Sequence, residues 1–367
     1  MDGIFTLAAQ GFSVAFTAAL VVVPLCIAIA LRYGVVDRPG GRKTHERVTP
    51  LLGGVGVLVA AASGLAVVAW QTGPGTAVDL NLPDLSLVIA ASLIMFVIGL
   101  VDDVFKDRMA FQLKLLGQIL GVAVIMWPRI VHLATEGGDL KEWLYSIFFL
   151  GWFLTIVNSF NFSDNMNGLM AGLSIIAFAA AVVYLGSKDS VRSMIVAVVL
   201  VGALLGFMPY NFPRSRVFLG DAGSMFTGFL MAFVLLNMSQ GFLGEAPEGD
   251  YGFSHLIPAI LIMGVPLYDA AFVVLMRLVE HRPIYLGDNH HLSHRLVRGG
   301  FTPVEAVVIL WGLGSFLAGI GVMAVFAKPA YRYLLLLASL LLMIAVTRVI
   351  MRFERRAGVG ALGASPR

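Results

Sequence analysis

Long apolar segments constrain the fold of this chain more than any other feature. Of its 367 residues, 59% are hydrophobic and 13% are charged, whereas soluble globular domains carry about 25% charged residues. Several of the apolar segments reach the roughly 20 residues that a helix needs to cross the hydrocarbon core of a bilayer. We therefore predict an all-α, polytopic integral membrane protein.

Hydropathy predicts eleven membrane-spanning helices. The fifth is short, so it would need a locally thinned bilayer or support from neighbouring helices. An odd number of spans places the two termini on opposite sides of the membrane. The predicted segments are 9–31, 51–70, 85–101, 111–128, 145–158, 169–186, 191–209, 223–240, 255–276, 304–327 and 332–350.

The distribution of Lys and Arg predicts the orientation of these helices. Most of the 25 Lys and Arg residues lie in one alternate set of loops and in the C-terminal tail. Because loops rich in these residues stay in the cytoplasm, we expect this set to be cytoplasmic and the N-terminus to lie outside. The opposite loops contain Arg129, Lys141, Lys188, Arg192, Lys328 and Arg332.

Composition also limits the classes of protein that need to be considered. The single cysteine, Cys26, excludes an intrachain disulfide and a cysteine metal cluster. The net charge of +3 gives no reason to expect a nucleic-acid partner, and the first ten residues lack the basic segment of a signal peptide. We expect residues 1–356 to form a single transmembrane domain and residues 357–367 a disordered cytoplasmic tail.

The chemically suggestive segments all fall on the predicted cytoplasmic side, and one of them begins with paired carboxylates. Asp102 and Asp103 end an apolar segment, and two adjacent carboxylates are stabilised by a divalent cation, a lysine or a shared proton. Lys106 and Lys114 follow, and a lysine there would offset the charge of a phosphate. The alternative is that the two carboxylates simply end a helix in water. These cytoplasmic segments are 32–50, 102–110, 159–168, 210–222 and 277–303.

Two further polar segments suggest binding of oxygen-rich ligands. Residues 158–168 contain four asparagines and Asp164, which suit a nucleobase, sugar hydroxyls or an oxygen-preferring cation. Helix capping would account for one or two of them. Asp221 lies beside glycines that would let a backbone approach a metal closely, although an N-cap carboxylate is the alternative there.

Basic and histidine-rich segments complete the polar side. Arg42 and Lys43 are candidates for phosphate binding, while attraction to anionic lipid head groups would explain most of the charge around them. Four of the seven histidines lie between residues 281 and 294. No cysteine or acidic ligand completes a zinc pattern there, so we expect one or two imidazoles to contact phosphate or transfer a proton.

In this order, the five segments resemble the polyprenyl-phosphate N-acetylhexosamine-1-phosphate transferase family (glycosyltransferase family 4), and most of all its bacterial members that use N-acetylglucosamine. The resemblance covers roughly residues 20 to 350. Its motifs are Arg42-Lys43-Thr44-His45 with Pro50 and Gly53-Gly54, Asp102-Asp103-x-x-Lys106, Asn158-x-x-Asn161-x-x-Asp164-x-x-Asn167-Gly168, Phe218-x-Gly220-Asp221-x-Gly223-Ser224, and His291-x-x-His294-Arg295.

The resemblance implies a Mg²⁺-dependent phosphotransferase of the bacterial inner membrane whose active site faces the cytoplasm. The enzyme would transfer N-acetylhexosamine 1-phosphate, with N-acetylglucosamine as the favoured sugar, from a UDP-sugar to undecaprenyl phosphate and release UMP. That reaction would be the first membrane step of a cell-envelope polysaccharide. Mn²⁺ is expected as a substitute for Mg²⁺, and a homodimer is a further expectation from the family.

The resemblance also implies roles for individual residues. Asp221 would be the principal Mg²⁺ ligand, with Asn161 and Asp103 beside it. Asp102 and Asp103 would act on the lipid phosphate, and the ring of Phe218 would stack on uracil. Other catalytic residues would be Lys106, His291 and His294, and other substrate-binding residues Arg42, Lys43, Lys114, Asn158, Asp164, Asn167 and Arg295.

Two departures from the family pattern bear on the substrate. Asn167 stands where the family commonly has an aspartate, so we do not expect it to act as an essential acid or base. Ser293 stands where another imidazole is common, which favours a simple amino sugar over a MurNAc-pentapeptide.

The alternative function is transport of an anion or a nucleotide sugar. A transporter should place ionisable groups near the midplane of several spans, and Asp269 is the exception among span centres that otherwise lack charge. A phosphotransferase acting on CDP-linked lipids is a second alternative, but the clustered Asp-Gly signature of that class is not found in the sequence.

Overall fold

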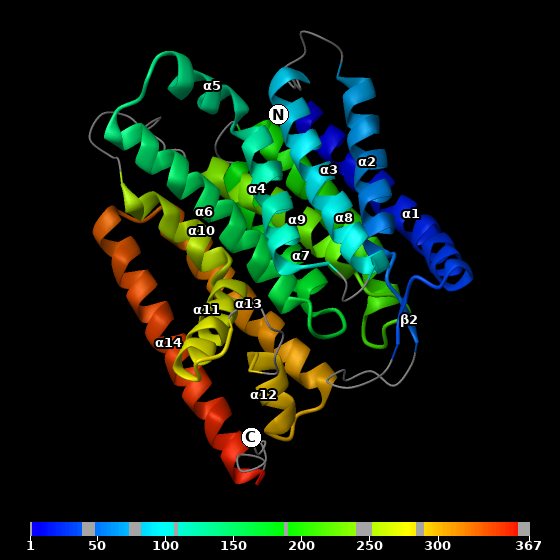
Figure 1. Cartoon of the computed structure of the whole chain (residues 1–367), viewed down its shortest axis with the longest axis vertical. Helices are drawn as coiled ribbons and strands as arrows, with labels where there is room; N and C mark the ends of the chain where they lie inside the picture. Colours follow the sequence, from blue (N-terminus) through cyan, green and yellow to red (C-terminus); the bar gives the residue numbers. More distant parts are fainter. Residues whose placement is uncertain are drawn as a thin grey trace.

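A computed structural model describes residues 2–38, 48–72, 82–105, 109–186, 190–239, 252–283 and 290–358. The described part is helical apart from two paired two-residue strands (Figure 1). The elements are α1 (Asp2–Tyr33), β1 (Val36–Asp37), β2 (Thr49–Pro50), α2 (Gly53–Gln71), α3 (Leu82–Phe105), α4 (Phe111–Ile125), α5 (Trp127–Thr135), α6 (Leu140–Ser163), α7 (Leu169–Leu185), α8 (Val191–Asn211), α9 (Gly220–Met238), the 3-10 helix η2 (Phe253–Leu256), α10 (Ile257–Ile262), α11 (Gly264–Val279), α12 (Leu292–Arg298), α13 (Pro303–Val325) and α14 (Pro329–Arg356).

The predicted all-helical membrane class is confirmed. Among the described residues, eight helices are long and apolar enough to cross a membrane, and the number rises to ten if each of two bent helix pairs counts as one span. The pair α4 and α5 is bent by 73°, and the pair formed by η2–α10 and α11 by 92°. The 17-residue α7 is apolar but shorter. Each predicted segment overlaps one of these helices or pairs, while the count of eleven spans stays a prediction.

The helices continue further into the polar segments than hydropathy predicted. Asp102 and Asp103 belong to the last turn of α3, and Asn158 and Asn161 lie inside α6. The segment 277–303 contains the short helix α12. Hydropathy detects contact with lipid, whereas a helix ends where its backbone hydrogen bonds end. Asp102, Asp103, Asn158 and Asn161 therefore stand on helices, which hold geometry more tightly than loops do.

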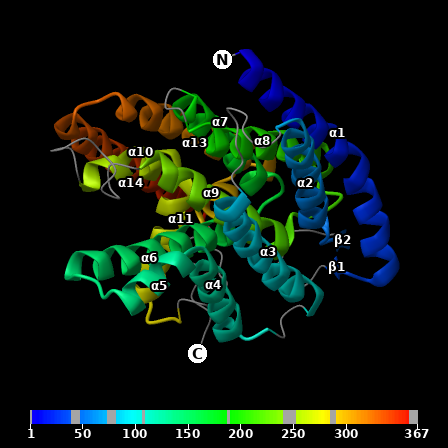
Figure 2. The same ribbon diagram turned by 90° about the horizontal axis from the view of Figure 1, so that it is seen from above.

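Helix α9 lies at the centre of the molecule, with α1 at its outer edge (Figure 2). In an apolar 18-residue stretch of α9, 83% is buried inside the protein. Small residues allow this close packing, since a Cβ on Gly99 of α3 would lie 2.3 Å from the carbonyl oxygen of Asp221. Gly53 and Gly54 donate backbone hydrogen bonds to the carbonyls of Phe218 and Leu219. The start of α9 is thereby held against α2 and the end of α3.

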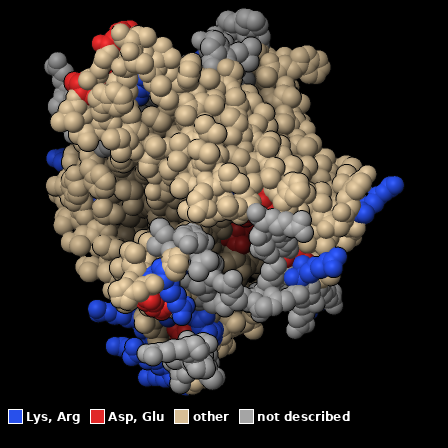
Figure 3. Space-filling view, in the orientation of Figure 1, with Lys and Arg blue, Asp and Glu red and all other residues tan. Residues whose placement is uncertain are grey.

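Positive charge gathers at one end of the molecule. In Figure 3 most of the visible Lys and Arg lie around the end that carries α12 and the last turns of α14, and acidic atoms are visible in a hollow just above it. Helix α1 begins near the opposite end of the long axis from the one where α14 finishes (Figure 1). This asymmetry agrees with the predicted charge distribution, and the orientation in a membrane stays a prediction.

Candidate active site

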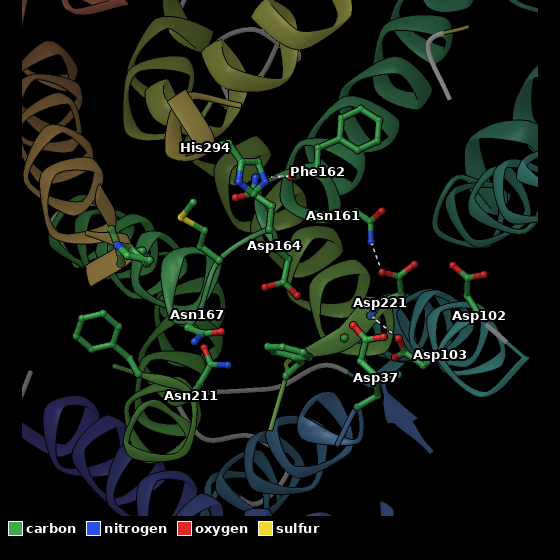
Figure 4. Close-up of a pocket in the computed structure, with 18 of the residues that line it drawn as sticks. Asp37, Asp102, Asp103, Asn161, Phe162, Asp164, Asn167, Asn211, Asp221 and His294 are labelled. Carbon is green, nitrogen blue, oxygen red and sulfur yellow. Dashed lines mark hydrogen bonds between the residues drawn. The ribbon is translucent and has the colours of Figure 1, made fainter. Parts of the chain in front are cut away.

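The hollow near the basic end is a cavity of about 860 Å³, a volume in the range of small-molecule sites. Its walls come from β1, α3, α4, α6, α9, α12 and α13, and from the turns that follow α6 and α8 (Figure 4). Ten residues predicted for the site line this cavity, namely Asp102, Asp103, Lys114, Asn158, Asn161, Asp164, Asn167, Phe218, Asp221 and His294. Three others, Arg42, Lys43 and Lys106, lie outside the described residues, and their roles stay predictions.

Lys114 of α4 lies among oxygen atoms from three other helices. Its Nζ atom is 2.9 Å from Oδ2 of Asp102 and 3.4 Å from Oδ1 of Asn161, and it also donates to Oδ2 of Asp221. The Lys114 side chain is only 15% exposed. Carboxylates in such an enclosed place need a compensating charge. The ammonium group therefore marks a position where carboxylate and amide oxygens together favour a cation.

Asp103 holds the first turn of α9. Its Oδ1 accepts from the backbone N–H of Asp221 at 2.9 Å, and its Oδ2 from that of Ala222 at 3.0 Å. N–H groups in a first turn have no partner within their own helix, and a negative charge there also favours the helix dipole. Leu219, not Asp221, is the N-cap residue of α9, so the alternative that Asp221 serves as an N-cap is wrong. Asp103 acts as a cap supplied by another helix and fixes the backbone of Asp221.

Asn161 fixes the side chain of Asp221. Its Nδ2 donates to Oδ1 of Asp221 at 2.7 Å and to the hydroxyl of Ser224 at 3.1 Å. With the amide nitrogen turned to these groups, Oδ1 of Asn161 faces Lys114. Asp221, placed by Asp103 from one side and by Asn161 from the other, therefore has little freedom to move.

The residues around Lys114 fit a magnesium site of a particular kind. No group of three His, Cys, Asp or Glu side chains able to hold a metal exists among the residues that the structure describes. Mg²⁺ commonly uses one or two carboxylates and takes its other ligands from water and phosphate oxygens. Asp221, Asp102 and the amide oxygen of Asn161 match that donor set. Both oxygens of Asp103 already accept N–H groups, so its geometry assigns it a positioning role, and its predicted role as a ligand stays untested.

Asn158 is held by a residue that the sequence reasoning missed. Its Nδ2 donates to Oε1 of Gln118 at 2.8 Å, and Nε2 of Gln118 donates back to Oδ1 of Asn158 at 3.3 Å. Gln118 is 1% exposed. The available signal was an amide four residues after Lys114 and so on the same face of α4, because a buried amide needs a partner. The pair joins α4 to α6 and so keeps Lys114 near Asn161.

The opposite wall is built from the turn after α6. Asp164 is the C-cap residue of α6, and Figure 4 shows its carboxyl group pointing into the cavity. Burial, together with the negative charge of Asp221, raises the pKa of Asp164 to about 7. The carboxyl group can therefore exist in either protonation state near neutral pH.

A second missed residue, Asn211, fixes this turn. Its Oδ1 accepts from the backbone N–H of Gly168 at 2.8 Å, and its Nδ2 donates to the carbonyl of Val217 at 2.9 Å. Gly168 has a φ of +77°, which side chains rarely tolerate. Asn211 thereby links the turn that carries Asn167 to the segment that carries Phe218.

Asp37 is a third cavity residue missed from the sequence. It lies on β1, and Figure 4 shows its carboxylate on the same side of the cavity as Asp103. The sequence feature that could have indicated Asp37 is its position next to a basic, glycine-containing segment. The pairing of β1 with β2 brings Asp37 to the cavity. This pairing could not be predicted from the sequence, because each strand has only two residues.

The histidine segment divides between the cavity and the protein interior. His294 lines the cavity, whereas His291 and Arg295 are each 5% exposed and are not among its described lining residues. His291 pairs with Asp269, and the guanidinium of Arg295 donates to Glu354 at 2.9 Å. The rings of His291 and His294 lie edge to face, but neither His291 nor Arg295 is among the described residues that line the cavity. The structure thus does not bring the predicted substrate-binding Arg295 to the cavity.

Comparisons with known proteins agree on a family. A family model described as glycosyl transferase family 4 matches residues 85–239, which include Asp102, Asn161 and Asp221. The probable undecaprenyl-phosphate N-acetylglucosaminyl 1-phosphate transferase of Bacillus subtilis (strain 168) is 29% identical over 91% of this chain and 88% of its own length. The undecaprenyl-phosphate alpha-N-acetylglucosaminyl 1-phosphate transferase of Escherichia coli (strain K12) is 27% identical over 85% and 83%. The decaprenyl-phosphate N-acetylglucosaminephosphotransferase of Mycolicibacterium smegmatis is 28% identical over 88% and 83%.

Proposed function

We propose, because a glycosyl transferase family 4 model matches residues 85–239 and the relatives are named for this reaction, that the protein transfers N-acetylhexosamine 1-phosphate from a UDP-sugar to undecaprenyl phosphate. N-acetylglucosamine is the favoured sugar, since the relatives are named for it. An oxygen of the lipid phosphate attacks the β-phosphorus of the UDP-sugar, the bond from that phosphorus to the bridging oxygen breaks, and UMP leaves. The product is a polyprenyl-diphospho-sugar that stays in the bacterial inner membrane, as the start of a cell-envelope polysaccharide.

One observation carries this proposal. Oxygen atoms from Asp102 of α3, Asn161 of α6 and Asp221 of α9 surround a single cationic group inside a cavity. Phosphoryl transfer needs little covalent participation by the protein, and positioning with charge stabilisation supplies most of the rate. A preformed cation position beside a space of about 860 Å³ is the arrangement that such a reaction requires.

The acidic residues have distinct tasks in the proposed reaction. When bound by Asp221 with Asn161 and Asp102, Mg²⁺, or Mn²⁺ in its place, would supply positive charge to the diphosphate oxygens. Asp103 keeps Asp221 in place through the start of α9. The lipid phosphate is already largely ionised at neutral pH, because the second pKa of a phosphomonoester is about 6. A general base is therefore not required, and Asp102 orients the nucleophile and balances the charge of Lys114.

The remaining cavity residues would bind the donor. Asp164 and Asn167 offer hydrogen-bonding groups from the turn after α6 to a nucleoside, and the ring of Phe218 would stack on uracil. His294, on the α12 side, would contact the diphosphate or the sugar. Lys114 would contact a phosphate oxygen, as an ammonium group close to the cation position can.

The transporter alternative loses its main support in the structure. Asp269 was the ionisable residue near a span centre, and both of its oxygens are used, by His291 and by the backbone N–H of Leu292. The polar residues of the cavity gather near the end of the molecule where Lys and Arg cluster (Figure 3). This arrangement favours catalysis near one membrane surface over a path across it.

A reconstituted assay tests the proposal. Purified protein in lipid nanodiscs is mixed with Mg²⁺, undecaprenyl phosphate and UDP-N-acetylglucosamine labelled in the sugar. We expect labelled lipid and one UMP for each lipid formed, with less product from UDP-N-acetylgalactosamine and none from UDP-MurNAc-pentapeptide. Absence of a lipid product with every UDP-amino sugar would overturn the proposed function. The Asp221→Asn variant, similar in size but lacking the charge, is the matched control.

A further inference from the structure

We propose that Asp269 is a positioning residue for this reaction, which fixes the ring of His291 and the start of α12 and thereby holds His294 at the cavity. The inference rests on the proposed function and assigns a task to a carboxylate outside the cavity. Asp269 lies on α11 and is 5% exposed.

Both oxygens of Asp269 have a defined partner on or beside α12. Oδ2 is 2.7 Å from Nδ1 of His291, and Oδ1 accepts from the backbone N–H of Leu292 at 2.7 Å. Leu292 is the first residue of α12, so its N–H has no partner within that helix. The N-cap residue, His291, makes no side-chain cap bond in the described structure. The carboxylate from α11 therefore replaces the missing cap and favours the positive end of the helix.

Capping alone does not account for a buried carboxylate at this place. Helices α6 and α13 are capped by Asp139 and Thr302, each in a local capping box. A buried acid costs desolvation, and an apolar replacement for a buried ionic pair is often neutral or stabilising. The second contact, with His291, is what distinguishes Asp269 from these ordinary caps.

This contact determines which nitrogen of His291 carries a proton. A carboxylate can only accept, so Nδ1 of His291 must be the donor. Nε2 then remains an acceptor when the ring is neutral. A carboxylate behind a histidine is a recurrent device that sets the tautomer and orientation of the imidazole.

The contact between Asp269 and His291 affects the cavity through one turn of α12. The rings of His291 and His294 meet edge to face, with centroids 6.1 Å apart and planes at 65°. His294 lines the cavity (Figure 4). Elsewhere on α12, Ser293 donates to Asn165 at 2.6 Å, and Arg295 and Arg298 bind Glu354. These contacts hold the rest of α12, while Asp269 holds its start, beside His294.

The Asp269→Asn variant separates positioning from capping. The Asn carbonyl can still accept from Leu292, but the amide group now faces Nδ1 as a donor and forces the proton of His291 onto Nε2. We expect near wild-type thermal stability, a kcat at least about tenfold lower, and a KM for the UDP-sugar within about twofold of wild type, since the loss falls on the transition state. Solid-state ¹⁵N spectra of histidine-labelled protein should show the changed tautomer of His291, whose signals the His291→Gln variant identifies.

The matched control is Glu354→Gln, which weakens the contacts of Glu354 with Arg295 and Arg298 on α12 and leaves the contact between Asp269 and His291 in place. It should leave the His291 signals unchanged and kcat within about twofold of wild type. The inference is overturned if Asp269→Asn keeps the wild-type kcat, if its His291 tautomer does not change, or if Glu354→Gln loses as much kcat. If the wild type itself makes no labelled lipid, the proposed function fails and the inference falls with it. An active wild type with an equally active Asp269→Asn variant sinks the inference alone.

Discussion

The carboxylate of Asp103 accepts hydrogen bonds from the backbone N–H groups of Asp221 and Ala222, so the end of α3 caps the start of α9. Asp102, the preceding residue on α3, instead contacts Lys114 beside the side chain of Asp221. The two adjacent acids therefore do different work. One holds the backbone of the proposed metal ligand, and the other shares its cation position.

Loss of the Asp103 cap should reduce both stability and turnover. In Asp103→Asn one backbone N–H of α9 loses its acceptor, and an unsatisfied buried donor costs about 1–3 kcal/mol. We expect a lower Tm and at least about a tenfold lower kcat, since Asp221 is no longer fixed. Thermal unfolding and the labelled-lipid assay measure these effects. Asp139→Ala, which removes an exposed cap of α6 away from the cavity, should lower Tm alone. A wild-type Tm in Asp103→Asn would contradict the assignment.

Removing either carboxylate of the cation position should affect turnover far more than folding. We expect Asp221→Asn to abolish lipid product and Asp102→Asn to lower kcat at least about a hundredfold, equivalent to ~2.7 kcal/mol of transition-state stabilisation. Single-turnover rates with labelled UDP-sugar measure the loss. Glu136→Gln, at a side chain that is 72% exposed, serves as the charge-matched control. Near-normal turnover in either site variant would remove the role assigned to that residue.

Lys114 should compete with Mg²⁺ for the same oxygens. In Lys114→Met the carboxylates of Asp102 and Asp221 lose their compensating charge, so the metal-free protein in EDTA should have a lower Tm than wild type. Added Mg²⁺ should then raise the Tm of Lys114→Met more than that of wild type, because binding to the folded state stabilises it and no ammonium has to move. Lys114→Arg keeps the charge and should resemble wild type. Equal Mg²⁺ responses in wild type and Lys114→Met would argue against a shared position.

Gly220 should tolerate no side chain. Its φ is +71°, and a Cβ would lie 2.6 Å from Oδ2 of Asp103. Gly220→Ala combines backbone strain of about 1–2 kcal/mol with displacement of the Asp103 carboxylate, so Tm and turnover should both fall. Gly137→Ala is the matched comparison, since Gly137 has a φ of +76° with nothing within 4 Å of the added Cβ. The Tm of Gly137→Ala should fall because of the backbone strain, while its turnover should stay at the wild-type level. Equal turnover in the two variants would contradict the steric argument.

The buried carboxyl of Asp164 should make stability fall as pH rises. Its pKa is raised to about 7 from an ordinary value near 4, so between these pH values the folded state binds more protons than the unfolded state. Unfolding of the metal-free protein should therefore become easier from pH 4 towards pH 7. The Tm of Asp164→Asn should be closest to that of wild type at pH 5. At pH 8 the Tm of the variant should be higher relative to wild type than it is at pH 5. A difference between the two proteins that does not vary with pH would show that Asp164 titrates normally.

Residue types and their order along the chain were enough to predict the membrane class and most of the polar side chains that line the cavity. Asp102, Asn161 and Asp221 were predicted as site residues because acidic and amide residues next to apolar segments are unusual, and the structure places all three around Lys114. Gln118 and Asn211 were missed, because the importance of an amide in a mostly apolar helix shows only when its partner is known. Arg295 was assigned to the cavity from its place in a motif, and the rotation of α12 turns it to Glu354 instead.

The sequence by itself predicted a helical membrane protein and picked out unusual acids, amides and bases beside its apolar segments, since apolar length and residue type are local properties. The tertiary structure decided which of those side chains meet. Whether Asp103 faces a helix terminus, or Asp269 faces His291, depends on the rotation and close approach of helices far apart in the chain. Packing of small residues such as Gly99 against the start of α9 sets that approach, because backbones can come so near only where no side chain intervenes.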